Sequence, residues 1–287
     1  MKHSGLFIAF FFVTFFCQAQ SDGMLWRISG NGLNKPSYLF GTMHITCNKE
    51  YVKKPAIKNA IDSSEIVVME LNPNDSDFLK EAMKYMMEPA EKNLSALMTE
   101  DEYKVVGKAC SELTGFNIGF FDNKKPMVLL TLLYASKEFM GCVSPIQMEN
   151  IIAGMAKDAK KITIGLESFG FQDSMMSSIP DTTQAKWIVD LCQDIPEAKA
   201  NFKAMQDVYD AQKAVELYDF ILKTSPEMKF EDVLIVQRNI KWVEFLKKRI
   251  NKHPYFVAVG AGHLGGETGV ISLLRKAGYT VVPIIMK

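Results

Sequence analysis

Short segments made almost entirely of apolar residues recur along this chain of 287 residues. The clearest are Ile66–Leu71 and Tyr255–Gly260, where one apolar side chain follows another with scarcely a polar position between them. A strand without a polar face has to be covered on both sides, and in several places these segments feed directly into helical stretches. The pattern therefore predicts an α/β (α+β) fold, with a central mixed sheet surrounded by helices.

Six segments are expected to form strands, and longer stretches between them to be helical. The expected strands are Met24–Ile28, Ser37–Gly41, Ile66–Leu71, Lys161–Glu167, Tyr255–Gly260 and Thr280–Ile285. The expected helical regions are Ala56–Ser64, Asp77–Ser144 (with a capping box at Thr99–Glu102), Ile146–Ala159, Thr182–Ile250 and Gly269–Ala277. Because no repeat or low-complexity linker interrupts this order, we expect residues 20–287 to form one domain with a helical insertion.

The first residues have the pattern of a signal peptide, which we place at residues 1–19. A basic start is followed by the apolar run Leu6–Phe16 and by small side chains suited to cleavage after Ala19. The run is short for a membrane span. A lipoprotein acylated at Cys17 is the alternative, although bulky residues precede that cysteine. We expect an exported protein, periplasmic or secreted, that is soluble once the signal is removed; peripheral membrane association stays compatible with the sequence.

The charge and the cysteine content of the chain argue against some kinds of binding partner and some kinds of metal site. Lysine plus arginine and aspartate plus glutamate number 33 each, and no basic run stands out, which argues against nucleic acid as a partner. Beyond residue 19 the cysteines are Cys47, Cys110, Cys142 and Cys192, without a Cys-x-x-Cys pair. A thiolate zinc site is therefore not expected, whereas export permits disulfides. We predict a bond between Cys47 and Cys142, which would fasten the turn after the second strand to the helical insertion.

Two expected strands end with the same motif, glycine, two residues and histidine. They are the segments Tyr38–His44 and Val257–His263. Glycine at a strand exit allows a sharp turn, and a histidine three residues later would lie where α/β sheets bind their ligands. The remaining histidine beyond residue 19, His253, precedes a proline and is expected at the surface.

Two glutamates repeat this theme, because Glu70 and Glu167 each finish an apolar strand segment. A carboxylate in such a place is unfavourable unless it is paired, hydrogen-bonded or bound to metal. The chain order histidine, glutamate, glutamate, histidine would be natural in a sheet made of two pseudo-symmetric halves. Two imidazoles with one or two carboxylates suit Zn²⁺, Mn²⁺, Co²⁺ or Fe²⁺.

Ordinary structural roles are open to each of these residues. His44 could cap a turn, His263 could bind a loop carbonyl, and the glutamates could cap helices or pair with Arg238. Arg238 and Asn239 lie together in an apolar helix, where the guanidinium could point at Glu70 or Glu167 or simply face solvent. Four ionisable groups at four strand exits nevertheless favour a common function.

Several familiar sites are absent from the sequence. The segment Gly260–Gly266 resembles an anion cradle at a helix start, but it lacks the lysine and hydroxyl of a P-loop and the pattern of a dinucleotide fingerprint. Neither His-Glu-x-x-His nor Gly-x-Ser-x-Gly occurs, so zincin and standard serine-hydrolase sites are not expected.

Taken together, these residues resemble the TraB/GumN family, which includes the Tiki metalloproteases. The segments that carry the resemblance are Leu25–Trp26, Leu39–His44, Glu70–Leu71, Gly165–Glu167 with Gln172, Arg238–Asn239, Gly260–Gly265 and Leu273–Tyr279. The resemblance implies an α/β fold with two related halves, shared distantly with erythromycin-esterase-like proteins. It also implies the divalent-metal peptidase activity of the Tiki branch, which requires both Gly-x-x-His motifs and a glutamate. Where the family often has an aspartate, this chain carries Glu149.

The sequence is thus interpreted as an exported, divalent-metal-dependent hydrolase acting on a peptide or protein. His44, Glu70 and His263 are the expected metal ligands, and Glu167 is a further ligand or the general base. Arg238, with Asn239 beside it, would orient a carboxylate or stabilise an oxyanion. Two alternatives stay open: a non-catalytic exported protein that binds a peptide or small ligand or acts as a regulator, and a metal-independent esterase-type hydrolase with His44 as its base.

Overall fold

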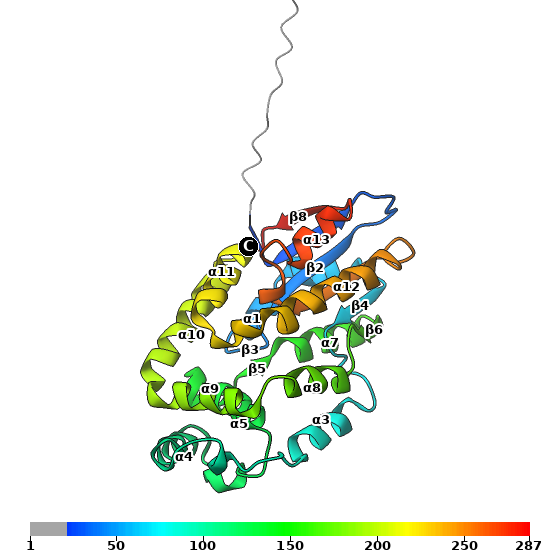
Figure 1. The fold of residues 1–287 in the computed structure, drawn as a ribbon. Helices are drawn as coiled ribbons and strands as arrows, with labels where there is room; N and C mark the ends of the chain where they lie inside the picture. The colour runs from blue at the N-terminus through cyan, green and yellow to red at the C-terminus, as the bar shows by residue number, and fades with distance from the viewer. Residues whose placement is uncertain (1–21) are drawn as a thin grey trace, which may run out of the picture.

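A six-stranded mixed sheet lies at the centre of the computed structural model, which describes residues 22–287 (Figure 1). The predicted signal peptide, residues 1–19, lies outside the described residues. The strands of the sheet are β1 (Leu25–Ser29), β2 (Ser37–Thr42), β4 (Ile66–Met69), β6 (Ile162–Gly165), β7 (Tyr255–Gly260) and β8 (Thr280–Ile284). All six predicted strands are confirmed. β4 and β6 end before the expected residue, so Glu70 and Glu167 follow their strands instead of closing them.

The strand order is β6-β4-β7-β2-β1-β8. The first four strands of this order are parallel to their neighbours, and β1 is antiparallel to both β2 and β8. β7 comes late in the chain, yet it lies between β4 and β2, which both come from the first part of the chain. Since parallel strands end at the same edge of a sheet, the residues after β6, β4, β7 and β2 meet there. The mixed sheet is confirmed, while a relation of two halves by internal symmetry stays a prediction.

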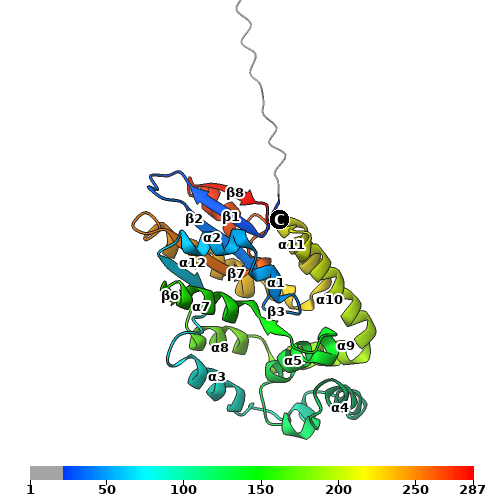
Figure 2. The ribbon, with the colours of Figure 1, turned by 180° about the vertical axis from the view of Figure 1, so that it is seen from behind.

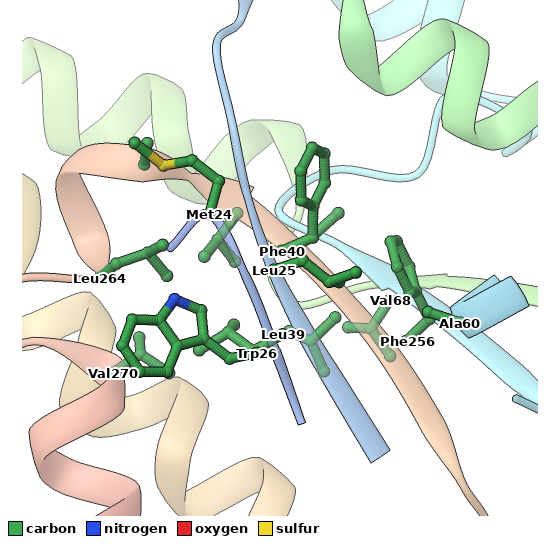
Figure 3. Packing of buried hydrophobic residues seen from close by; sticks show 14 of the residues in the cluster. Met24, Leu25, Trp26, Leu39, Phe40, Ala60, Val68, Phe256, Leu264 and Val270 are labelled. Carbon is green, nitrogen blue, oxygen red and sulfur yellow. The ribbon is translucent and has the colours of Figure 1, made fainter. Parts of the chain in front are cut away.

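Helices cover both faces of the sheet, as the two opposite views show (Figures 1 and 2). On one face lie α1 (Lys49–Val52), α2 (Pro55–Asp62) and α7 (Met148–Asp158). On the other lie α12 (Gln237–Lys247) and α13 (Val270–Lys276). Between these layers the strands bury Trp26, Leu39, Phe40 and Phe256 almost completely (Figure 3). This buried packing makes the sheet rigid, and the sheet carries the candidate site at one of its edges.

The helical part of the chain forms a second hydrophobic core beside the sheet. Its helices are α3 (Phe78–Met87), α4 (Glu100–Thr114), α5 (Pro126–Ala135), α6 (Lys137–Met140), α8 (Phe169–Ser177), α9 (Asp181–Gln193) and α10 (Ile195–Asp210). The next helix, α11 (Ala214–Thr224), packs against the core of the sheet. The predicted helical regions and the capping box at Thr99 are confirmed. Short 3-10 turns occur at Leu94–Ala96, Ile118–Phe120, Pro226–Phe230 and Ala261–His263, and a π-helical turn at Asp232–Val236 precedes α12.

A small second sheet connects the two parts of the molecule. It pairs β3 (Ile45–Thr46) with β5 (Ile146–Gln147), which replaces the first turn of the helix predicted from Ile146. Next to it, the predicted disulfide between Cys47 and Cys142 is present and spans 95 residues of sequence. The turn that carries His44 is therefore fastened to the helical part, as expected from the sequence. Among residues 22–287, no helix has the length and apolar character needed to cross a bilayer.

Candidate active site

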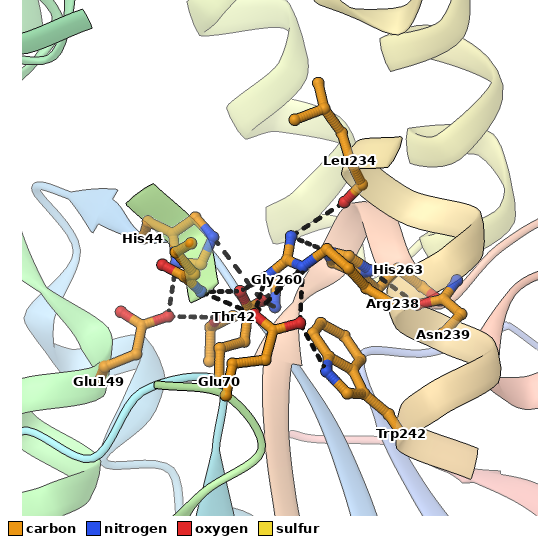
Figure 4. Close-up of polar contacts among 12 residues, drawn as sticks. Thr42, His44, Glu70, Glu149, Leu234, Arg238, Asn239, Trp242, Gly260 and His263 are labelled. Carbon is orange, nitrogen blue, oxygen red and sulfur yellow. Dashed lines mark hydrogen bonds and ion pairs between the residues drawn. The ribbon is translucent and has the colours of Figure 1, made fainter. Parts of the chain in front are cut away.

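Four neighbouring parallel strands each deliver one polar side chain to the same edge of the sheet (Figure 4). His44 follows β2, Glu70 follows β4, Glu167 follows β6, and His263 ends the 3-10 turn after β7. The two imidazoles face a single oxygen of Glu70: Oε1 lies 3.9 Å from Nε2 of His44 and 3.8 Å from Nε2 of His263. The two nitrogens therefore lie at most twice that distance apart. The structure brings the four residues together in one site, as the matched strand ends predict.

The ring of His44 is oriented by a carboxylate from α7. Nδ1 of His44 lies 2.7 Å from Oε1 of Glu149, and the same oxygen accepts a hydrogen bond of 2.6 Å from the Thr42 hydroxyl. A carboxylate only accepts hydrogen bonds, so Nδ1 carries the proton and Nε2 faces Glu70. Glu149, with Glu70 as a weaker contributor, raises the pKa of His44 to about 9, against the opposing effect of partial desolvation by the surrounding protein. The side chain of His44 is 60% exposed, so this ring is the solvent-facing member of the site.

The ring of His263 is buried and held by an amide. Nδ1 of His263 lies 2.7 Å from Oδ1 of Asn239. The amide nitrogen of Asn239 donates to the carbonyls of Thr268 (2.9 Å) and His263 (3.3 Å), which fixes the orientation of the amide. Nδ1 of His263 must then be the donor, which leaves Nε2 as the acceptor of a hydrogen bond of 3.1 Å from Nη1 of Arg238. Burial lowers the pKa of His263 to about 3, so the ring is neutral.

Glu70 lies between the imidazoles and is ionised. Its Oε1 accepts a hydrogen bond of 2.7 Å from the backbone N–H of Gly260, and its Oε2 accepts one from Arg238. Burial alone would raise the pKa of Glu70, but the positive charge of Arg238 and the neighbouring imidazoles hold it well below its usual range. Gly260 has no room for a side chain, since a Cβ would lie 2.9 Å from Nε2 of His44 and 3.3 Å from Oε1 of Glu70.

Arg238 is the cation of the site and is held chiefly by Glu167. Its Nε and Nη2 donate to both oxygens of Glu167 at 2.9–3.2 Å, and Nη1 lies 3.1 Å from Nε2 of His263. The oxygens of Glu167 also accept from Trp242 Nε1 (2.9 Å) and Gln172 Nε2 (3.0 Å). Because both oxygens of Glu167 already accept hydrogen bonds from several donors, the geometry favours a role in which Glu167 holds Arg238 in position. The prediction that Arg238 points at Glu70 or Glu167 is confirmed for both.

The π-helical turn before α12 contributes to the position of this arginine. Its Leu234 carbonyl accepts a hydrogen bond of 2.9 Å from Nη1 of Arg238. The guanidinium also lies over the Trp242 ring, 4.7 Å from its centroid. A π-turn shifts the register of the following helix, and such turns frequently occur at functional sites. One stretch of helix thus supplies Arg238, Asn239 and Trp242 to the site.

The donor atoms suit a divalent cation in kind. The Nε2 atoms of both imidazoles face one carboxylate oxygen of Glu70, and each ring has its Nδ1 anchored to a side-chain oxygen, as in metal-binding histidines. To bind a cation, His44 would lose its Nε2 proton and His263 would lose its hydrogen bond from Arg238. In the present arrangement of residues 22–287, no group of three histidine, cysteine, aspartate or glutamate side chains is close enough together to hold a metal ion. Neighbouring ligands around a tetrahedral ion lie roughly 3.4 Å apart. The imidazoles would have to approach Glu70 by about half an ångström, and the contact between Arg238 and His263 would have to open.

The glycine-rich segment after β7, which resembles an anion cradle in sequence, has a packing role in the structure. The N–H of Gly260 is already bound to Glu70, and α13 begins only at Val270. Added Cβ atoms at Gly265 and Gly266 would come within 2.5 Å and 2.6 Å of Tyr218 in α11. These glycines therefore allow close approach of a helix.

Sequence reasoning gave no function to Glu149, Gln172 or Trp242, which contact the site residues directly. For Glu149, the sequence offers one indication of a role in the site: it is an acidic residue in the first turn of the otherwise mainly apolar helix α7. His253, expected at the surface, is exposed and pairs with Glu65 at 2.7 Å.

Comparison with known proteins identifies the family of the chain. The chain is 23% identical to Metalloprotease TIKI1 of Xenopus tropicalis, over 92% of this chain and 62% of that protein. It is 22% identical to the uncharacterized protein YbaP of Shigella flexneri, over 84% of this chain and 89% of YbaP. The chain thus spans less than two thirds of the TIKI1 relative. No solved structure matches it. Residues 24–283 match the TraB/PrgY/gumN family, and the chain therefore belongs to that family.

Proposed function

We propose that this protein is a divalent-metal-dependent hydrolase and that its substrate is a peptide or protein. The observation that carries the proposal is the matched orientation of the two histidines. Each has its Nδ1 proton directed to a side-chain oxygen, and each presents Nε2 to the same oxygen of Glu70. The peptide substrate rests on distant relatives named metalloproteases.

His44, His263 and Glu70 would hold the ion, with Glu149 and Asn239 fixing the two rings from behind. A divalent cation bound there supplies a polarised carbonyl and a water of lowered pKa. Arg238 places a fixed positive charge beside that position, suited to a substrate carboxylate or a developing oxyanion. Glu167 holds this charge through both of its oxygens, so we assign it to positioning Arg238.

A metal-independent hydrolase with His44 as base is the second candidate, because the exposed His44 and its partner Glu149 resemble a catalytic pair. The charge of that pair argues against it. With a pKa near 9, His44 carries a proton at neutral pH and cannot accept another. A bound cation would displace this proton, so the same ring serves the metal-dependent mechanism.

We further propose that the protein acts outside the cytoplasm. The bond between Cys47 and Cys142 supports this location, since disulfides persist in oxidising compartments. Mn²⁺, Co²⁺, Zn²⁺ and Fe²⁺ are the candidate ions, because imidazole and carboxylate ligands suit all four.

The test combines metal analysis with hydrolysis. Protein purified without a histidine tag is stripped with a chelator, reloaded with each ion in turn, and assayed on fluorescein-labelled casein. We expect cleavage only in reloaded protein, and its loss together with bound metal in His44→Ala and His263→Ala. The control is His253→Ala, because that histidine is exposed and pairs only with Glu65 in the part of the chain described. Full activity in the stripped protein or in both site variants would overturn the proposal.

A further inference from the structure

A pocket of about 540 Å³ opens directly beside His44. Its volume lies within the range of roughly 300–1,000 Å³ usual for ligand sites. Met43, His44 and Ile45 form one end, and helices α9, α10 and α11 with the turn after α11 form the walls. A molecule in the pocket would therefore touch the solvent-facing ring of the candidate active site.

The walls of the pocket are mainly apolar and aromatic. From α10 they include Ala198, Asn201, Phe202 and Met205, whose spacing places them on one face of the helix. The opposite walls include Tyr134, Met140, Trp187, Phe220 and Met228. Aromatic and methionine side chains in a concave surface favour a large apolar group.

Apart from His44 at one end, which is paired with Glu149, the charged groups that line the pocket are all acidic. Asp190, Asp194, Glu197 and Glu227 line it, and none of its described lining residues is lysine or arginine. Asp190 is neutralised by Lys186 and Asp194 caps α10, whereas Glu197 and Glu227 form no ion pair within residues 22–287. Carboxylates without partners favour a cationic group in the occupant.

Glu227 also connects this pocket to a smaller one. Together with Tyr134 and Trp187 it lines a second cavity of about 190 Å³, whose other walls include Met127, Leu130 and Leu234. The surroundings desolvate this carboxylate, and burial raises the pKa of Glu227. A cation placed beside Glu227 would restore part of the lost solvation.

We propose that this pocket is a specificity site that binds a large apolar side chain of the substrate, next to a lysine, an arginine or a free amino group. The proposal rests on the proposed function for the identity of the occupant as a peptide. It assigns Phe202, Trp187 and Tyr134 to the apolar side chain and Glu227 to the cation.

Binding of labelled peptides without turnover tests the proposal. The probe is the fluorescein-labelled hexapeptide Ala-Ala-Phe-Lys-Ala-Ala, compared by fluorescence anisotropy in chelator with peptides carrying Asp for Phe or Glu for Lys. We expect each exchange to weaken binding by about tenfold or more. The variant Glu227→Gln should bind the peptides with Lys and with Glu more equally, because the carboxylate that attracts the cation is gone. Its preference for the peptide with Phe over the peptide with Asp should be unchanged.

Filling the pocket provides the matched variants. Ala198→Trp, on the lining face of α10, should weaken binding of the Phe-Lys peptide by at least about tenfold. Ala200→Trp, exposed on the opposite face of the same helix, should leave it unchanged. Asn201→Trp is a second filling variant at an exposed lining residue, where folding is least at risk.

The outcomes separate this proposal from the proposed function. Selective binding that is lost in the filling variants supports the pocket even if no peptide is ever cleaved. Cleavage without preference for the Phe-Lys peptide, or unchanged binding in folded Ala198→Trp and Asn201→Trp, would overturn the pocket and leave the hydrolase standing.

Discussion

Replacing Arg238 by methionine should destabilise the protein strongly and in a pH-dependent way. Arg238 serves two buried carboxylates, since the side chains of Glu70 and Glu167 are 8% and 5% exposed. Removal of one member of a buried ion pair typically costs about 3–5 kcal/mol. The N–H of Gly260, Trp242 and Gln172 still donate to these carboxylates. We therefore expect the lower end of that range, about 3 kcal/mol at pH 7.

The direction of the pH dependence follows from Glu70. In the wild type its pKa in the folded state lies below the unfolded value, so its stabilising contribution is present above pH 4.5 and is lost as the pH falls below it. Without Arg238, burial dominates and the folded pKa of Glu70 rises above the unfolded value. The variant is then most stable near pH 4 and loses stability as the pH increases. The difference in unfolding free energy between the two proteins should accordingly grow from pH 4 to pH 7.

Urea unfolding of the metal-free proteins, followed by circular dichroism at both pH values, measures this difference. Arg249→Met is the matched control, because Arg249 is exposed and its guanidinium lies over Phe245 at 4.1 Å without a carboxylate partner in the described residues. The unfolding free energy of this control variant should fall by less than about 1 kcal/mol. Equal stability of Arg238→Met and wild type at pH 7, or an equal loss at pH 4 and pH 7, would refute the assigned role of Arg238.

Three further predictions concern other contacts of the site. Glu149→Gln should lower the pKa of His44 from about 9 toward its ordinary value near 6.5, as measured by NMR titration of the metal-free protein. The ion pair stabilises the folded state below about pH 6.5 and loses this effect as the pH rises toward 9, so the stability difference from wild type should shrink over that range. Reduction of the Cys47–Cys142 bond should lower Tm, with a loss of about 2–5 kcal/mol in unfolding free energy. Gly260→Ala should abolish metal-dependent hydrolysis, because its Cβ would displace His44.

The controls for these predictions are available in the same chain. Gly154→Ala adds a methyl group to α7 where no atom lies within 4 Å, so it should stabilise the helix by about 0.5–1 kcal/mol without loss of activity. A double Cys47→Ser/Cys142→Ser variant should melt at the same temperature with and without reductant. Unchanged hydrolysis by Gly260→Ala, or a pKa of His44 unaffected by Glu149→Gln, would contradict the geometry of the site.

Local patterns were sufficient to predict the strands and the residues at their ends. Apolar runs define β2, β4, β6 and β7, and a shared sheet edge then brings His44 and His263 together. The cysteine pair could be predicted because export favours disulfides and because Cys47 closely follows the first histidine turn. These inferences needed only neighbouring residues and general rules of sheet geometry.

The partners of the site residues could not be predicted in this way. Glu149 is separated by 105 residues from His44, and Asn239 by 24 from His263, so no local spacing links them. Arg238 was expected to meet either Glu70 or Glu167, and it binds both because α12 crosses above the ends of two adjacent strands. Such contacts depend on how helices dock on the sheet, which sequence periodicity does not specify.

The order of strands in the sheet determines when the site can come into existence. β7 belongs to the last part of the chain, yet it is the strand that joins β2 to β4. Before residues 255–260 insert between them, a growing chain carries His44, Glu70 and Glu167 without holding them in one place. Pairing over such sequence distances is slow compared with the formation of local helices. The proposed hydrolase would therefore have no working site while the chain is still being synthesised, and would gain one only where folding is completed.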